Sequence, residues 1–204
     1  MTSKLIIFDL GGVVTSPAVE TIDVRVANFL GIDSNELRSI TSSYKVELTK
    51  GNIKLIDVYT CVAEKLNLQQ NPEEILTKHL EVCKAVFLEV WNQETLRVIN
   101  RLKPNYKVVA LANAEREVIP IARELGLYLP FEKSYISCEL GMMKPDAVAY
   151  QTVLNDYHCS PQEAIFIDDK LENVQGAERL GIKGIHFTPK TNLETELVKF
   201  GIKV

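Results

Sequence analysis

Short runs of consecutive apolar residues alternate along the chain with segments in which apolar residues recur at helical spacing. The apolar runs are rich in β-branched residues, and their continuous character is typical of parallel strands that are covered on both faces. We expect strands at residues 4–9, 106–113, 134–138, 164–168 and 184–187.

The segments between these strands predict helices at residues 92–103, 115–126 and 171–181, the last two ending at a glycine. Pro120 fits the second helix only if it lies in the first turn. Strand–helix alternation of this kind predicts an α/β fold, a Rossmann-like core built on a doubly wound parallel sheet.

Residues 16–90 differ from the rest because they show helical patterns and no convincing strand. Pro72, followed by two glutamates, is typical of a helix start within this segment. We therefore expect two units. Residues 1–15 and 91–204 form the α/β core, and residues 16–90 form a small helical bundle inserted after the first strand.

Composition narrows the class of protein. The 204 residues are 46% hydrophobic with a net charge of −4, which is ordinary for a soluble globular chain. No Lys/Arg run offers a footprint for nucleic acid. No apolar run approaches the roughly 20 residues that span a bilayer, and no signal-peptide pattern opens the chain. We expect a cytoplasmic protein without nucleic-acid or membrane partners; no pattern indicates its oligomeric state.

Polar residues gather where the predicted strands end. In an open parallel sheet, ligands bind at the carboxyl ends of the strands. Asp9, Asn113 and the pair Asp168-Asp169 follow strands, and Lys144 lies in the loop "GMMKPD". Carboxylates suit Mg²⁺, which also binds substrate phosphate oxygens, and a lysine supplies charge against phosphate. A carboxylate can also attack phosphorus to form an aspartyl phosphate.

Four motifs in this order resemble the haloacid dehalogenase-like (HAD) superfamily over nearly the whole chain. They are "FDLGGVV", "LAN" at 111–113, "GMMKPD" and "IFIDDKLENVQGA". The helical insert resembles the C1 cap of that superfamily. The four motifs together are far more specific than any one alone.

The resemblance implies a role for each motif residue. Asp9 would attack phosphate, and Lys144 would neutralise Asp9 and the phosphate. Asp9, the Gly11 carbonyl and Asp168 or Asp169 would hold Mg²⁺. The remaining implied roles are phosphate binding at Asn113 and Gly12, and support of the fourth motif's loop by Asn173. Gly11 and Gly12 would let the backbone approach metal and phosphate in conformations closed to other residues.

The chain departs from the family pattern at two positions. The general acid/base that usually stands two residues after the nucleophile is replaced by Gly11, and the usual Ser or Thr of the second motif is Ala112. A general acid typically contributes ~10²–10⁴-fold. A transition-state hydrogen-bond donor contributes ~10²–10³-fold.

Three interpretations follow. The first is a Mg²⁺-dependent phosphatase of a small phosphorylated metabolite, weakened at these positions or using an acid from the cap. The second is a 2-haloacid dehalogenase, which needs no acid because halide leaves unprotonated; the Asp168-Asp169 pair disfavours it. The third is a catalytically degenerate fold that binds a phosphometabolite or a protein.

Some residues near the motifs also have structural interpretations. Asn113 can cap the helix that follows it. Glu115 and Arg116 are interpreted as exposed charges in a first helical turn. Trp91 is interpreted as a packing anchor where the insert joins the core.

Overall fold

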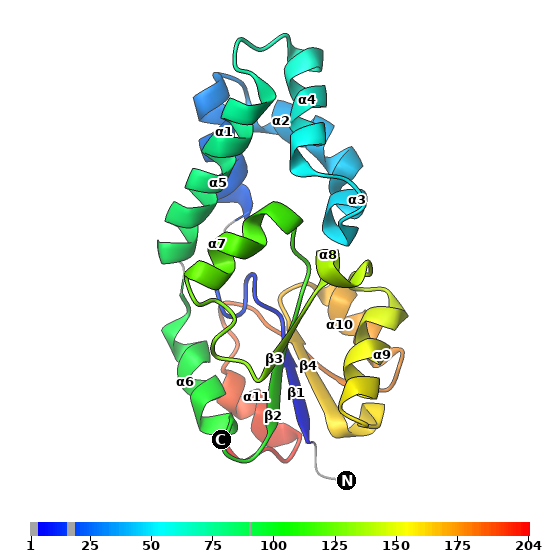
Figure 1. Cartoon of the computed structure of the whole chain (residues 1–204). Coiled ribbons are helices and arrows are strands. Elements are labelled where there is room, and N and C mark those ends of the chain that lie inside the picture. The colour runs from blue at the N-terminus through cyan, green and yellow to red at the C-terminus, as the bar shows by residue number, and fades with distance from the viewer. Residues whose placement is uncertain (1–3, 16–18, 90) are drawn as a thin grey trace.

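A computed structural model describes residues 4–15, 19–89 and 91–204. Within these residues the chain forms one sheet covered by helices, with a group of helices at one end of it (Figure 1). The predicted α/β class is confirmed.

Five parallel strands form the sheet in the order β3-β2-β1-β4-β5, which places the N-terminal strand at its centre. Phe8 pairs with Ala110 on one side and with Ile167 on the other. Each predicted strand is confirmed within one or two residues. The strands are β1 (Leu5–Phe8), β2 (Lys107–Ala112), β3 (Lys133–Ile136), β4 (Ala164–Asp168) and β5 (Lys183–His186).

Alternate residues of the strands pack against helices on opposite faces of the sheet (Figure 1). Ile6 and Phe8 of β1 join an apolar cluster with α6 (Gln93–Leu102) and α11 (Leu193–Lys199). Leu5 and Ile7 join a second cluster with α9 (Ala147–Asp156) and α10 (Leu171–Glu178). Burial on both faces explains why β1 is apolar at every position.

Shorter elements complete the core. The helix predicted at 115–126 is divided into η2 (Arg116–Val118) and α7 (Ile119–Glu124), and Pro120 lies in the first turn of α7, where its missing N–H is tolerated. The others are α8 (Ser137–Leu140) and η3 (Pro161–Glu163).

The segment between β1 and α6 is helical, as expected, and lies over the carboxyl ends of the strands (Figure 1). We refer to residues 19–89 as the helical insert. Its elements are α1 (Val19–Leu30), α2 (Ser34–Thr41), η1 (Ser42–Tyr44), α3 (Lys45–Lys50), α4 (Leu55–Leu66) and α5 (Pro72–Glu89). The predicted boundaries at residues 16 and 90 lie outside the described residues, so the division into two units stays a prediction.

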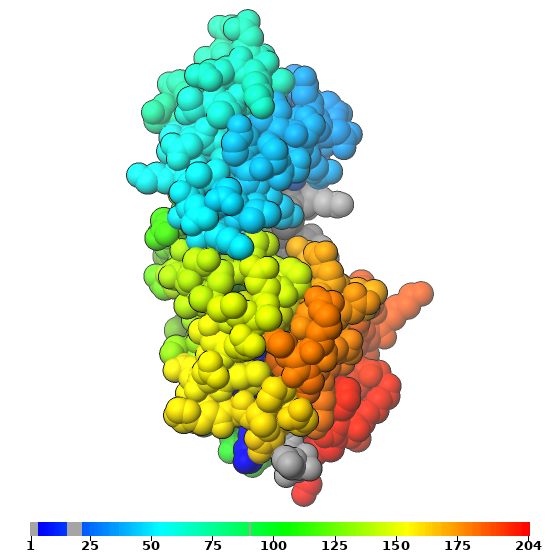
Figure 2. All heavy atoms as spheres, turned by 90° about the vertical axis from the view of Figure 1, so that its right-hand side faces the viewer, coloured from blue at the N-terminus to red at the C-terminus, as the bar shows by residue number. Residues whose placement is uncertain are grey.

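The insert and the core share one apolar cluster, to which the core contributes Val118, Ile119, Ile136 and Cys138. In Figure 2 the insert is seated directly on the core. Polar contacts connect the same surfaces: the Leu55 N–H donates to Glu117 Oε1 at 3.0 Å. Lys50 Nζ lies 3.0 Å from Asp146 Oδ2. No helix of the described residues has the length and apolar character needed to span a bilayer.

Candidate active site

The centre of the site is a buried lysine between two carboxylates. Asp9 directly follows β1 and Asp168 ends β4, the strand beside it, so both acids lie at the same sheet edge. The Lys144 ammonium lies 2.6 Å from Asp9 Oδ1 and 2.7 Å from Asp168 Oδ2. All three residues are buried. The structure therefore brings together three sequence-predicted residues that are far apart in the chain.

Burial and charge set the protonation of this group. Burial is the main reason that the pKa of Asp9 is raised to about 6, and the nearby Asp168 charge adds to it while Lys144 opposes it. Burial alone would lower the pKa of Lys144, but the charges of Asp9 and Asp168 together raise it above its ordinary value. Lys144 is therefore a permanent cation, and Asp9 is ionised at neutral pH.

Besides its ion pair with Lys144, Asp168 accepts hydrogen bonds from two residues. The Asn173 side chain donates to both of its carboxylate oxygens at 3.0 Å, and the Lys170 N–H donates to Oδ1 at 2.8 Å. The Asn173 carbonyl in turn accepts a hydrogen bond from the Tyr150 hydroxyl at 2.8 Å. Asn173, predicted to support the loop of the fourth motif, is placed to do so. Neither Asp168 nor Asp169 is the N-cap residue of the helix that follows them, because Lys170 occupies the N-cap position of α10.

Asp169 is the acid of this group that is free to bind a ligand. Its Oδ1 is buried without a hydrogen-bond partner. Burial, followed by the Asp168 charge, raises the pKa of its carboxyl. One oxygen each of Asp9, Asp168 and Asp169 lie within 4.8 Å of one another. An unpartnered buried carboxylate oxygen beside two further carboxylates fits a hard cation such as Mg²⁺.

The structure requires a glycine at position 12 but not at position 11. Gly12 has a φ of +81°, and a Cβ on it would collide with the Asp169 carboxylate. A Cβ on Gly11 would meet no atom within 4 Å, and φ of Gly11 is not positive. The expectation that Gly11 also needs a conformation closed to other residues is therefore wrong. The space beside Gly11 accepts a side chain, so no steric reason excludes an acid there. A ligand role for the Gly11 carbonyl stays a prediction.

This difference predicts opposite outcomes for two single substitutions. Gly12→Ala is expected to lower the free energy of unfolding by about 1–3 kcal/mol, because alanine is strained at this φ and displaces Asp169. Gly11→Ala, the matched control, is expected to stay within ~0.5 kcal/mol of the wild type. Urea denaturation of both variants measures this. An equal loss in the two variants would contradict the assignment.

Asn113 binds the backbone of the lysine loop. Its Nδ2 donates to the Lys144 carbonyl at 2.9 Å, and its Oδ1 accepts from the Lys144 N–H at 3.0 Å. The capping alternative for Asn113 is wrong, since Glu115 is the N-cap position of η2. Asn113 thus fixes the loop that carries Lys144, and its role in phosphate binding stays a prediction. Ala112, just before it, is 3% exposed and packs in the apolar cluster between the sheet and helices α6 and α11.

Glu115 is not the exposed charge that the sequence suggested. It is only partly exposed. Burial, followed by the charges of Glu117 and Asp23, raises its pKa to about 7, and Lys45 opposes this. The helical insert causes the burial, so no local signal reveals it. Arg116 is exposed, as the sequence suggested, and its guanidinium donates to the Cys138 carbonyl at 3.1 Å.

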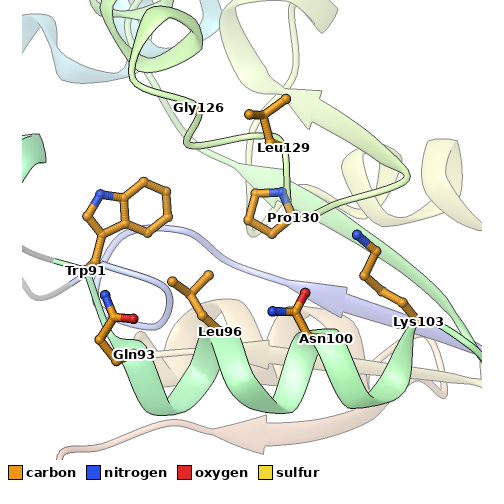
Figure 3. A pocket seen from close by; sticks show the side chains of 8 residues that line it. All are labelled: Trp91, Gln93, Leu96, Asn100, Lys103, Gly126, Leu129 and Pro130. Atoms are coloured by element: carbon orange, nitrogen blue, oxygen red, sulfur yellow. The ribbon is translucent and has the colours of Figure 1, made fainter.

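A hollow of about 420 Å³ lies away from these residues (Figure 3). Trp91, Leu129 and Pro130 face the side chains of Leu96 and Asn100 on α6 across it. Trp91 is half-buried and packs against the apolar cluster between the sheet and helices α6 and α11. Its backbone pairs with that of Thr15. Its interpretation as a packing anchor agrees with this position.

Comparison with known proteins identifies the family. The model of the haloacid dehalogenase-like hydrolases matches residues 3–181, most of the chain. The chain belongs to the haloacid dehalogenase-like hydrolase family.

Relatives of similar length are phosphatases by name. A sesquiterpene phosphatase, astK, of Aspergillus oryzae is 28% identical over 191 residues, which cover 92% of this chain and 91% of that protein. D-ribitol-5-phosphate phosphatase of Bacteroides thetaiotaomicron is 24% identical, covering 88% of this chain and 89% of that protein.

A solved HAD family enzyme from Bacteroides thetaiotaomicron, in complex with magnesium and inorganic phosphate, superposes with a TM-score of 0.73. It is 20% identical and covers 95% of this chain and 98% of that chain. At this identity the likeness establishes the fold, and the HAD-like architecture expected from the four motifs is confirmed.

Proposed function

We propose that this protein is a Mg²⁺-dependent phosphatase that removes phosphate from a small organic phosphate ester through a phosphorylated Asp9. The observation that carries the proposal is the buried Asp9 carboxylate, held by Lys144 at 2.6 Å, beside the unpartnered oxygen of Asp169. A nucleophile, a fixed cation and a place for a metal thus share one sheet edge. The names of the two phosphatase relatives support a phosphorylated small molecule as the substrate.

The chemistry assigns one step to each group. Asp9 attacks phosphorus, the bond to the leaving oxygen breaks, and that oxygen takes up a proton. Water then attacks the aspartyl phosphate, which releases inorganic phosphate and restores Asp9. The Lys144 ammonium offsets the negative charge of Asp9 and of the phosphoryl oxygens throughout, and its buried position needs no reorganisation during the reaction.

We expect the metal to bind at the acidic cluster of Asp9, Asp168 and Asp169. Asp9, Asp169 and the Gly11 carbonyl would hold Mg²⁺, with Asp168 orienting the group through its bonds to Lys144 and Asn173. Bound Mg²⁺ supplies positive charge that stabilises the transferring phosphoryl group.

Two alternatives are tested by the same assays. Gly11 and the buried Ala112 favour a protein that binds a phosphate ester without turning it over. A dehalogenase would release halide without a metal, and the free oxygen of Asp169 disfavours it.

Metal removal tests the proposal. Turnover of a panel of alkyl phosphates and acyl phosphates is expected to stop with excess chelator and to return with Mg²⁺. Metal-independent halide release, or Mg²⁺ binding without turnover of any phosphate, would contradict it and support the dehalogenase or the binding protein, respectively.

Asp169→Asn is expected to raise the dissociation constant for Mg²⁺ by at least about 10-fold, because the unpartnered oxygen loses its charge. Titration calorimetry with Mg²⁺ measures this without any substrate. The matched control is Glu172→Gln, which removes an exposed carboxylate three residues away. Unchanged affinity in Asp169→Asn would exclude Asp169 as a ligand.

A further inference from the structure

The apolar cluster between the sheet and helices α9 and α10 reaches the acids of the site. Ile7 of β1 and Phe166 of β4 belong to this cluster and pair with each other in the strand register. Residues two apart in a strand share a face of the sheet, so Asp168 lies on the same face as Phe166. Asp9 follows Ile7 in the same way. The Asp9 N–H donates to the Ile167 carbonyl at 2.8 Å, which continues the strand ladder as far as Asp9.

Lys144 brings its ammonium over the ring of Phe166 on this face. Its Nζ lies 5.3 Å from the ring centroid, within the roughly 6 Å over which an aromatic face attracts a cation. The same Nζ contacts Asp9 at 2.6 Å and Asp168 at 2.7 Å. The lysine and the ring are both fully buried, and such an attraction is strongest where water is excluded. The ammonium thus contacts two carboxylates and lies over one aromatic face.

The ring of Phe166 is itself held in a defined orientation. Tyr150 of α9 meets it in a T-shaped arrangement, with the ring centroids 5.3 Å apart and an angle of 79° between the rings. The Tyr150 hydroxyl donates to the Asn173 carbonyl at 2.8 Å. The Asn173 side chain in turn donates to Asp168 at 3.0 Å. Tyr150 therefore connects the ring near the ammonium to the residue that fixes one of the two carboxylates.

Packing by itself gives no reason for an aromatic residue at position 166. Leu5 and Ile7 of β1 fill the same cluster with aliphatic side chains. An aliphatic side chain at position 166 would also be apolar, but it would present no negative face to the ammonium. Lys144 would then depend on the two carboxylates alone, and in the proposed reaction one of them is the nucleophile.

The ring acts differently on the charges of the site before and during the proposed reaction. An aromatic face attracts a cation and repels an anion. As Asp9 bonds to phosphorus, its negative charge passes to the phosphoryl and leaving oxygens. Ligands bind outside the carboxyl ends of the strands, so these oxygens are farther than Asp9 from the ring of Phe166. The repulsion falls while the attraction for Lys144 stays, and the ring therefore favours the transition state over the free enzyme.

We propose that Phe166 is a positioning residue of this enzyme, whose ring face holds the Lys144 ammonium at the sheet edge while Asp9 bonds to phosphorus. The assignment rests on the proposed phosphatase function. Phe166 acts through Lys144 and does not touch the substrate. The role requires an electron-rich ring at this position, whereas a role in packing requires only an apolar side chain of similar size.

Fluorination of the ring separates these two roles, because each fluorine withdraws charge from the ring face and changes its size little. The test places 4-fluoro-, 3,5-difluoro- and 3,4,5-trifluorophenylalanine at position 166 by nonsense suppression, with phenylalanine inserted in the same way as the reference. We expect kcat with acetyl phosphate and Mg²⁺ to fall in that order. The fall should reach about 3–30-fold with the trifluoro ring, the range that the energy of a cation over a ring corresponds to.

A second variant tests the same role without fluorine. Phe166→Leu keeps an apolar side chain but has no ring, so it is expected to lose at least as much kcat as the trifluoro ring. Thermal unfolding shows whether each protein is folded at the temperature of the assay. A folded Phe166→Leu variant with the kcat of the wild type would overturn the assignment.

The matched control is the same fluorinated series at Phe8, a fully buried ring of the central strand. Phe8 packs in the cluster on the other face of the sheet, with its ring 6.2 Å from that of Phe131. This series is expected to leave kcat unchanged. An equal kcat for all three analogues at position 166, or the same decline at position 8, would contradict a role of the ring face. A wild type that hydrolyses no phosphate with Mg²⁺ would instead overturn the proposed phosphatase function.

Discussion

Asp9→Asn is expected to lower kcat by at least about 10³-fold with every phosphate ester that the wild type hydrolyses. The amide cannot attack phosphorus, and we do not expect a neighbouring acid to replace it, because Asp169 is proposed to hold Mg²⁺. Asp168 is occupied by Lys144, Asn173 and the Lys170 N–H. Asparagine has the same shape and keeps an oxygen for Lys144, so the loss should not come from unfolding.

The measurement is steady-state hydrolysis with Mg²⁺ and acetyl phosphate, which avoids any dependence on a proton donor. The control is Asp33→Asn, the same substitution at the N-cap of α2, where Asp33 accepts the Asn35 N–H at 2.7 Å. Asparagine caps helices as well as aspartate does, so this control should retain full activity. An Asp9→Asn variant within about 10-fold of the wild type would exclude Asp9 as the nucleophile.

Lys144→Met is expected to have the largest effect on stability, a loss of about 3–5 kcal/mol in the free energy of unfolding. It leaves Asp9 and Asp168 buried at the same edge without the cation that both contact. The control, Lys133→Met, breaks the exposed ion pair with Asp156 and should cost less than about 1 kcal/mol.

The pH dependence of Lys144→Met follows from the same charges. The pKa of Asp9 is raised to about 6 even with Lys144 present, and the loss of Lys144 raises it further. A carboxyl with a raised pKa in the folded state destabilises the fold above that pKa. As the pH falls from 8 to 5, protonation relieves the repulsion in the variant and weakens the ion pair in the wild type. Urea denaturation should show the gap between them narrowing; a constant gap would contradict a charge-based origin.

The fold could be predicted because its signals are local and agree with one another. Each strand is a continuous apolar run, since both faces of the sheet are covered, and Phe8 and Ile167 show this at the centre. The acids of the site could be predicted for the same reason: Asp9 and Asp168 stand where such runs end. A parallel sheet brings those ends together.

The features of the site that could not be predicted depend on contacts between segments that are distant in the sequence. The two hydrogen bonds of Asn113 to Lys144 join residues 31 apart. The different requirements at Gly11 and Gly12 arise from φ and from the approach of Asp169. Glu115 looks like an exposed charge in its own segment, and only the packing of the helical insert buries it. No local sequence pattern indicates these contacts.

The most direct test of the central claim is to trap the covalent intermediate. The protein is incubated with acetyl phosphate and Mg²⁺ and reduced with borohydride, which converts an aspartyl phosphate to homoserine, and its peptides are then analysed by mass spectrometry. We expect homoserine at Asp9, dependent on both Mg²⁺ and acetyl phosphate. Turnover of acetyl phosphate with Asp9 unmodified, or modification of a different carboxylate, would contradict the account.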